Sequence, residues 1–177
     1  MILPFGEHLP CLAPDVFVAP GALVIGRVEI GRGSGVWFNT VLRGDVDSIT
    51  VGEDSNIQDL TMVHVGADTP TTIGNRVTIG HRAVIHGCVL EDECLVGMGA
   101  IIQNRARIGR HALVGSGSVV REGFEVPPGM LALGVPAVVK RELTAAEVEM
   151  ILRSSRGYAE RAQRYRTALS QTRVEGT

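Results

Sequence analysis

The sequence predicts an all-β solenoid followed by one C-terminal α-helix. Three observations predict this fold class. Aliphatic residues recur at every sixth position, glycine is abundant while aromatic residues are scarce, and an amphipathic segment with a helix-capping pattern ends the chain. Glycine accounts for 22 of the 177 residues, or about 12%, against roughly 7% in ordinary domains. The aromatic residues are only four Phe, two Tyr and one Trp. A core of Val, Ile, Leu and Ala with frequent tight turns follows from this composition.

The clearest run of the repeat lies between residues 96 and 120. An aliphatic residue stands at every sixth position there, and a small residue stands four positions after each of the first four. The same pattern begins at Val51 and at Ile73, and a less regular copy begins at Ile30. The aliphatic residues of the clearest run are Val96, Ile102, Ile108, Val114 and Val120, and the small ones are Ala100, Ala106, Ala112 and Ser118.

A period of six differs from the 3.6 of a helix and from the simple alternation of an antiparallel strand. It is typical of a coil in which three short strands close a triangular prism, so that one coil takes 18 residues. Adjacent coils then stack as parallel ladders about 4.8 Å apart, and we expect the small residues where the chain turns. A β-sandwich is the alternative, but the chain contains no Asn-Gly or Asp-Gly hairpin pair.

Two segments are expected, a β-helix over residues 1–140 and an amphipathic helix over residues 141–177 that packs along the prism. Thr144 and Glu147 have the spacing of a capping box. A basic, nucleic-acid-binding helix is the weaker alternative, because acidic residues interleave with the arginines. The residues expected on the apolar helix face are Val148, Ile151, Tyr158, Ala162, Tyr165 and Leu169.

Charge and hydropathy limit the partners. The chain has 17 Lys and Arg against 19 Asp and Glu, so a nucleic-acid partner is not expected. No apolar run approaches the roughly 18 residues that a membrane span needs, and the N-terminus lacks the pattern of an export signal. We therefore expect a soluble, cytoplasmic protein without a membrane partner.

Counting along the repeat places three histidines. Between Val63 and Ile73 the repeat is four residues too long, which predicts a loop at a corner. Without those four residues, His64 and His86 are one coil apart, and we expect them to stack on the same edge. From Ile85 to Leu90 the repeat is one residue too short, a second irregularity beside His86.

His81 is expected at a neighbouring corner, too far away to complete a site within one chain. In a threefold assembly, a neighbouring subunit could bring its own His81 to this chain's His64 and His86. Three imidazoles with an open fourth position are the ligand set of a catalytic zinc site. Alternatives stay open at this point, because surface histidines are often not metal ligands and a single histidine can serve as the base of an acyltransferase.

Several segments occur in the order and spacing of the gamma-class carbonic anhydrase-like family, which the chain resembles over about residues 10–140. The closing Leu133–Pro136 segment and the final helix fit as well. The matching segments are Val41–Asp45, Asn56–Asp59, Val63–Val65, Ile79–His81, Ile85–Cys88 and Val96–Gly99. The resemblance implies a left-handed parallel β-helix, a hand that strand physics alone would not predict.

The resemblance also implies a mechanism. It implies a homotrimer with metal sites at the subunit interfaces, where one subunit supplies the ligands matching His64 and His86 and its neighbour supplies His81. A zinc-bound hydroxide, with Fe²⁺ or Co²⁺ as alternative metals, would attack CO₂ or another small-molecule substrate to give bicarbonate.

Four further residues match functional positions of the family. Arg43 and Asp45 would join subunits near the metal, and a purely structural trimer contact is favoured over a catalytic role. Gln58 and Asp59 would hydrogen-bond around the site, with Gln58 orienting the hydroxide. Alternatively, Asn56 and Asp59 only satisfy backbone groups of their turn.

Two departures from the family bear on rate. The most active members carry a proton-shuttling glutamate directly after the aspartate matching Asp45, and here that position is Val46. A tyrosine often found near the C-terminal end of the family's β-helix is Ala132. The expected activity is therefore weak. The alternatives are a hexapeptide-repeat acyltransferase or thioesterase acting on acyl-CoA, or a non-catalytic trimeric accessory protein, and metal content separates the first hypothesis from these.

Overall fold

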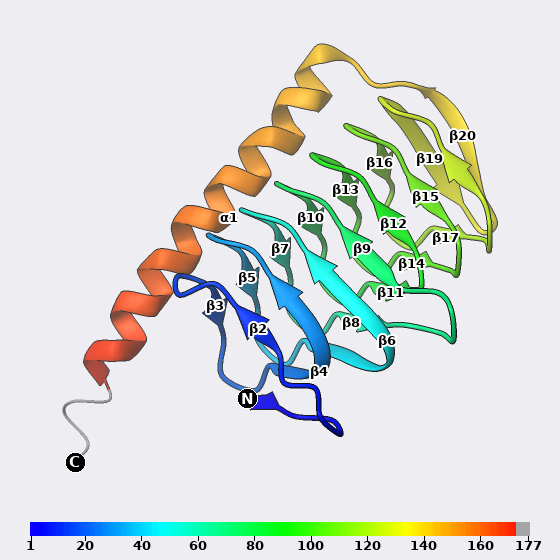
Figure 1. The fold of residues 1–177 in the computed structure, drawn as a ribbon. Coiled ribbons are helices and arrows are strands. Elements are labelled where there is room, and N and C mark those ends of the chain that lie inside the picture. Colours follow the sequence, from blue (N-terminus) through cyan, green and yellow to red (C-terminus); the bar gives the residue numbers. More distant parts are fainter. Residues whose placement is uncertain (173–177) are drawn as a thin grey trace.

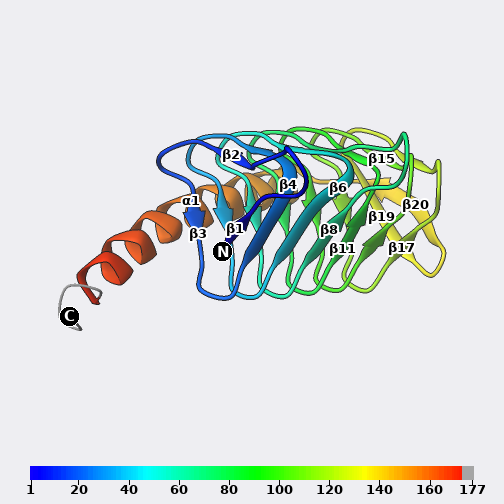
Figure 2. The same cartoon turned by 60° about the horizontal axis from the view of Figure 1, so that its bottom comes forward.

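The computed structural model describes residues 1–172, which form a three-sided parallel β-helix with one long helix along its side (Figure 1). Seen after a 60° turn, the coils lie one behind another with nearly the same outline (Figure 2). Two long strands, β4 (Leu23–Ile30) and β6 (Val41–Val51), bend around one corner and run on two faces of the prism. The predicted solenoid of hexapeptide repeats is confirmed.

Each face is a ladder of short strands. The first face holds the beginnings of β4 and β6, and the second face holds their ends. The first face is completed by β1 (Ile2–Leu3), β8 (Met62–His64), β11 (Val84–His86), β14 (Ile101–Ile102) and β17 (Val119–Val120). The second is completed by β2 (Cys11–Leu12), β9 (Thr71–Ile73), β12 (Val89–Leu90), β15 (Arg107–Ile108) and β18 (Glu125–Val126).

The third face is a separate eight-stranded sheet. It is parallel except for its last strand, which pairs antiparallel with its neighbour and closes the C-terminal end of the prism. Its strands are β3 (Phe17–Val18), β5 (Gly35–Val36), β7 (Asn56–Ile57), β10 (Thr78–Ile79), β13 (Leu95–Val96), β16 (Leu113–Val114), β19 (Met130–Gly134) and β20 (Ala137–Glu142).

Strand register confirms the counting. Regular coils advance 18 residues, as where Leu95 pairs with Leu113. The coil with the inserted loop advances 22, so that His86 lies beside His64. The next coil advances only 17, as where Val84 pairs with Ile101. Inward residues of the first face are fully buried in a stack that runs through Val24, Leu42, Val63, Ile85, Ile102 and Val120.

The corners differ in one respect from the expectation. The small residues are buried at the corners, but the residue that turns the chain precedes each of them and has a positive φ. Gly99 (φ 67°) precedes Ala100, and Arg105 (φ 58°) precedes Ala106. A positive φ at the third position is typical of a type II β-turn, and the amide of Ala106 closes this turn on the carbonyl of Gln103. The small side chain therefore fits the interior of the prism, and the positive φ of the residue before it makes the turn.

Helix α1 (Ala145–Thr172) packs along the third face, against β3, β5, β7 and β10. The capping box is confirmed, because Glu147 accepts from the backbone N–H of Thr144 (2.8 Å) and the Thr144 hydroxyl accepts from that of Glu147 (3.3 Å). Ile151 and Ala162 are fully buried. Strand β20 still occupies residues 141 and 142, and residues 173–177 of the predicted helical segment lie outside the described residues.

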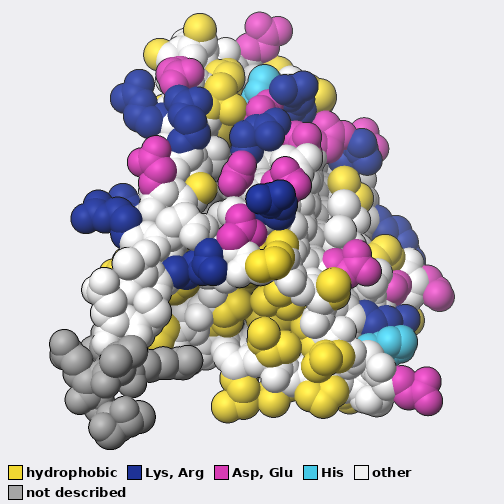
Figure 3. All heavy atoms as spheres, turned by 60° about the vertical axis from the view of Figure 1, so that its left-hand side comes forward, with side chains coloured by type: hydrophobic (Ala, Val, Ile, Leu, Met, Phe, Trp, Pro, Cys, Tyr) yellow, Lys and Arg dark blue, Asp and Glu magenta, His cyan; other side chains and the backbone are white. Residues whose placement is uncertain are grey.

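Hydrophobic side chains gather at the end of the prism that holds the first coils, while charged side chains alternate over the other end (Figure 3). Met1, Phe5 and Leu9 are among the exposed hydrophobic residues of that first end. Between residues 1 and 172, no helix combines the length and apolarity that crossing a membrane requires.

Candidate metal centre

Two histidines face each other at the corner between the first and second faces. His64 ends β8 and His86 ends β11, and the parallel register places them side by side. Nδ1 of His64 lies 3.1 Å from Nε2 of His86, and the ring centroids are 5.0 Å apart. The predicted stacking of these two residues is confirmed.

The other ring nitrogens both meet acceptors. Nε2 of His64 lies 2.9 Å from a carboxylate oxygen of Asp45, and Nδ1 of His86 lies 2.5 Å from the amide oxygen of Asn104. An acceptor requires an N–H, so in the neutral rings the protons lie on these outer nitrogens. The two inner nitrogens then point lone pairs at each other.

Facing lone pairs suit a cation between the rings. A hydrogen bond between the rings would need a second proton on one of them, whereas a divalent metal accepts both lone pairs. Two imidazole nitrogens on one tetrahedral zinc are separated by about 3.3 Å, given Zn–N distances of about 2.0–2.1 Å. The observed 3.1 Å is close to this value, so the donor set fits a metal.

Asp45 connects the pair to Arg43. Its carboxylate accepts a hydrogen bond from the Arg43 guanidinium as well as from His64. Loss of water around Asp45 would by itself raise the pKa of its carboxyl, but the hydrogen bonds from His64 and Arg43 outweigh this and lower the pKa to about 2. A carboxylate therefore stands beside His64 at neutral pH, and it holds the proton on the outer nitrogen of the ring.

His81 lies at another corner, between the third and first faces, just after β10. Its Nδ1 is 2.8 Å from a carboxylate oxygen of Asp59, which holds the same position one coil earlier. The Asp59 carboxylate thus contacts the histidine instead of only serving its own turn. Because Asp59 meets Nδ1, the opposite nitrogen of His81 is left for another partner.

Gln58 is buried directly before Asp59, with 5% of its surface exposed. Its amide nitrogen donates to the Asn56 side-chain oxygen (3.1 Å), and Asn56 in turn donates to the Thr78 hydroxyl (2.9 Å). This chain of hydrogen bonds fixes the Gln58 amide at the corner that carries His81.

The structure therefore brings the predicted residues together as two groups. His64, Asp45 and Arg43 join His86 at one corner, while Gln58 and Asp59 join His81 at the other. Among residues 1–172, no group of three or more His, Cys, Asp or Glu side chains is placed to hold a metal ion within one chain.

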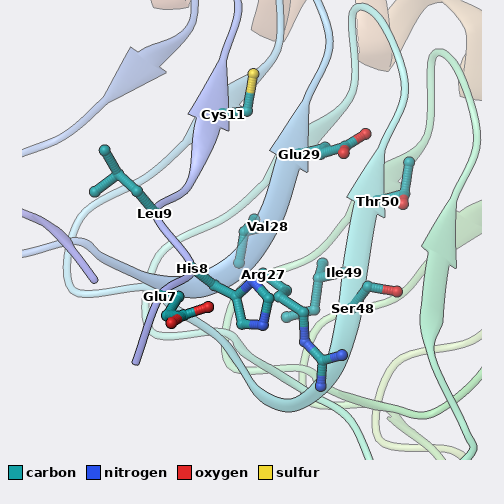
Figure 4. Close-up of a pocket in the computed structure, with 10 residues that line it drawn as sticks. All are labelled: Glu7, His8, Leu9, Cys11, Arg27, Val28, Glu29, Ser48, Ile49 and Thr50. Atoms are coloured by element: carbon teal, nitrogen blue, oxygen red, sulfur yellow. The ribbon is translucent and has the colours of Figure 1, made fainter. Parts of the chain in front are cut away.

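A hollow of about 440 Å³ lies next to the Val46 bend but contains none of the predicted ligands. Its walls come from Glu7, His8, Leu9 and Cys11 near the N-terminus and from residues of β4 and β6. Figure 4 shows Arg27 pointing away from Cys11 there. Arg27 donates a hydrogen bond to the carbonyl oxygen of Val46. This contact pins the backbone of the bend that follows Asp45.

Asn104 is the functional neighbour that sequence reasoning missed. It lies 18 residues after His86, whereas the strand register of this coil advances 17, so a count along the ladder would have pointed to Gln103 instead. Thr71 was missed as well. Its hydroxyl donates to the backbone carbonyl of His64 (2.7 Å) and accepts from the amide of Gly87 (2.9 Å), which ties the two histidine-bearing strands together.

The fold and the paired histidines define a left-handed β-helix protein of the hexapeptide-repeat class. Residues 70–104 match the hexapeptide repeat of succinyl-transferase. A carbonic anhydrase of Geobacillus kaustophilus is 42% identical over 174 residues, which cover 98% of this chain and 95% of that protein. The chain belongs to the gamma carbonic anhydrase-like family.

Two further relatives show the range of this likeness. Gamma carbonic anhydrase 2 of Arabidopsis thaliana, a mitochondrial protein, is 47% identical over 89% of this chain, which spans 59% of the plant protein's length. The crystal structure of a hexapeptide transferase family protein from Anaplasma phagocytophilum superposes with a TM-score of 0.90 at 39% identity, covering 93% of this chain and 97% of that one.

Proposed function

We propose that this protein is a metal-dependent lyase of the gamma carbonic anhydrase type, which hydrates CO₂ to bicarbonate in the cytoplasm. The observation that carries the proposal is the pair of facing nitrogens on His64 and His86, whose outer nitrogens are already bound to acceptors. Zinc is the metal proposed first, because three imidazoles with an open position are a catalytic zinc set, and Fe²⁺ or Co²⁺ would accept the same ligands.

The proposed third ligand, His81, comes from a neighbouring subunit of a homotrimer. The three faces of the prism differ in a way that favours this assembly. Helix α1 covers the third face. On the second face the outward residues are mostly polar, in the ladder Glu29, Thr50, Thr72, Val89, Arg107 and Glu125. On the first face, the outward residue that precedes each inward aliphatic is itself aliphatic or Met, in the ladder Leu23, Val41, Met62, Val84, Ile101 and Val119.

This first face lies between the corner of His64 and His86 and the corner of His81. None of the described elements covers it, and Ile101 is 36% exposed. An uncovered apolar stripe of this length marks an interface. Three prisms that bury this face around a threefold axis would bring the His81 corner of one subunit to the paired histidines of the next.

A metal held there supplies the Lewis acidity that makes water a nucleophile near neutral pH. The residues of this chain do the remaining work. Asp45 and Asp59 orient His64 and His81 through their outer nitrogens, and Arg43 balances the charge of Asp45. The amide of Gln58, held by Asn56, would orient the attacking oxygen toward CO₂.

The test is metal content and hydration rate measured together on protein purified without added metal. The expected result is close to one metal ion per chain, with CO₂ hydration that disappears in His64→Ala. A metal-free protein that hydrolyses or transfers an acyl group from acyl-CoA would establish the acyltransferase or thioesterase alternative. A metal-free protein without either activity would favour an accessory role.

A further inference from the structure

The two irregularities of the repeat meet beside His86. The inserted loop after His64 ends at Thr71, and the shortened corner after His86 consists of Gly87 and Cys88. The Gly87 amide donates both to the Thr71 hydroxyl (2.9 Å) and to the His64 carbonyl (3.1 Å). These hydrogen bonds therefore connect the inserted loop to the shortened corner, and together the two irregularities fix the position at which β11 ends at His86.

Because Gly87 has no side chain, it also leaves room for the side chain of Asn104 from the next coil. It has a φ of +54°, and a Cβ at this position would lie 2.6 Å from the side-chain oxygen of Asn104 and 3.0 Å from the Thr69 hydroxyl. Any larger residue would push Asn104 away from the corner. The shortened corner thus lets the Asn104 side chain reach the His86 ring.

The contact specifies the protonation of the ring. The Asn104 amide oxygen accepts a hydrogen bond from Nδ1 of His86 at 2.5 Å. A neutral imidazole with its proton on Nδ1 has its lone pair on Nε2, the nitrogen that faces His64. If the amide were reversed, its nitrogen would donate to Nδ1 and the proton would move to Nε2, where it would block a metal.

We propose that Asn104 is a positioning residue that holds His86 with its proton on Nδ1, so that Nε2 is free to bind the metal. The proposal rests on the proposed function, because it concerns the same site. Residues that orient a metal-binding histidine through its other nitrogen typically contribute 10–100-fold to metal affinity. Asn104 corresponds in this respect to Asp45 at His64, with a neutral acceptor in place of a charged one.

The test compares Asn104→Leu, which keeps the size but removes the acceptor, with Asn104→Asp, which keeps an acceptor oxygen. Asn75→Leu is the matched control, because Asn75 also precedes a residue with positive φ, Arg76 (φ 53°), but lies at the corner between the second and third faces. Zn²⁺ affinity is measured by competition with a chromophoric chelator. We expect about 10–100-fold weaker binding in Asn104→Leu, and binding within about threefold of the wild type in the other two. Equal affinity in Asn104→Leu and the wild type would overturn the proposal.

A second measurement reports on the ring directly. In metal-free protein with ¹⁵N-labelled histidine, two-bond ¹H–¹⁵N spectra distinguish the two tautomers of His86. The wild type and Asn104→Asp should show the proton on Nδ1, and Asn104→Leu should lose this preference. A wild type with the proton on Nε2 would overturn the proposal. This readout needs no bound metal, so failure of the proposed function, seen as no zinc binding by the wild type, is distinguishable from failure of the role of Asn104.

Discussion

The position of His81 distinguishes a metal site shared between subunits from a metal site within one chain, because His81 lies at a different corner of the prism from His64 and His86. Changing His81→Ala should therefore remove the metal as completely as His64→Ala or His86→Ala does, since each change deletes one of the three proposed ligands. The measurement is metal per chain after purification and dialysis. Retention of a full complement of metal by His81→Ala would contradict the proposed ligand set.

Mixing variants tests the division of the site. His81→Ala chains keep the His64 and His86 pair, and His86→Ala chains keep His81, so an interface that combines the two intact halves is whole. Metal binding should reappear when the two proteins are mixed under conditions in which subunits exchange, with exchange followed by fluorescent labels. Exchange without any recovery of metal would show that the ligands are not divided in this way.

Val46 stands at the position where a proton-carrying group would help the proposed reaction. It directly follows Asp45, is 50% exposed, and has its carbonyl pinned by Arg27, so a new side chain there should not disturb the bend. Valine cannot carry a proton, and hydration must release one in each turnover. We expect slow turnover in dilute buffer that rises with imidazole concentration. Val46→Glu should raise the rate more in dilute than in concentrated buffer, as measured by stopped-flow with metal content matched. A wild-type rate that is fast and independent of buffer would contradict this expectation.

At the scale of the elements, the repeat was predictable because its cause is local. Each inward aliphatic packs on the residue one coil away, and insertions or deletions shift the count visibly, as they do at His64 and His86. The turning residues were not predictable, because charged residues such as Arg76, Glu93 and Arg105 adopt positive φ alongside the glycines. Contacts between coils, such as that of Asn104 with His86, required the exact register.

Glu93 stabilises a corner built from such contacts. Its side chain is 9% exposed and contacts Arg76, Arg110 and His111. Burial by itself would raise the pKa of the Glu93 carboxyl, but hydrogen bonds from these three partners, led by Arg110, lower it to about 2. A lowered carboxyl pKa means that the stabilisation is present above the ordinary pKa of about 4.3 and is lost as the pH falls toward 2.

Glu93→Gln should therefore lower the free energy of unfolding at pH 7 by about 1–3 kcal/mol. The difference from the wild type should shrink between about pH 4.3 and pH 2. Denaturant unfolding at a fixed protein concentration across this pH range provides the measurement. Glu122→Gln is the control, because Glu122 and its partner Arg105 are both exposed and such pairs contribute about 0–1 kcal/mol. If the difference in the free energy of unfolding between Glu93→Gln and the wild type does not change with pH, the stabilisation does not come from the lowered pKa of Glu93.

At the scale of the whole molecule, the residues of the apolar first face follow a pattern in the sequence, but this face was not predicted from the sequence. The residue before each inward aliphatic is itself apolar along this face, as at Val41, Met62 and Val84, whereas the corresponding residues of the second face are mostly polar. A period of six reveals which residues point inward. Only the assignment of each strand to a face shows that the outward apolar residues line up between the two histidine corners.

In the proposed trimer, assembly and metal binding depend on the same face of the prism. Val84 and Val89 lie in the same coil, both are partly exposed and both point outward, but Val84 is on the apolar first face and Val89 on the polar second face. A charge at Val84 would be buried without a partner in the proposed interface, which costs several kcal/mol, whereas a charge at Val89 would stay in water. Val84→Glu should therefore yield monomers by light scattering and lose its metal, while Val89→Glu should remain a trimer with its full metal content. Both variants should keep the circular dichroism of the β-helix. A folded Val84→Glu monomer that still binds one metal ion per chain as tightly as the wild type would show that the site does not need a neighbouring subunit.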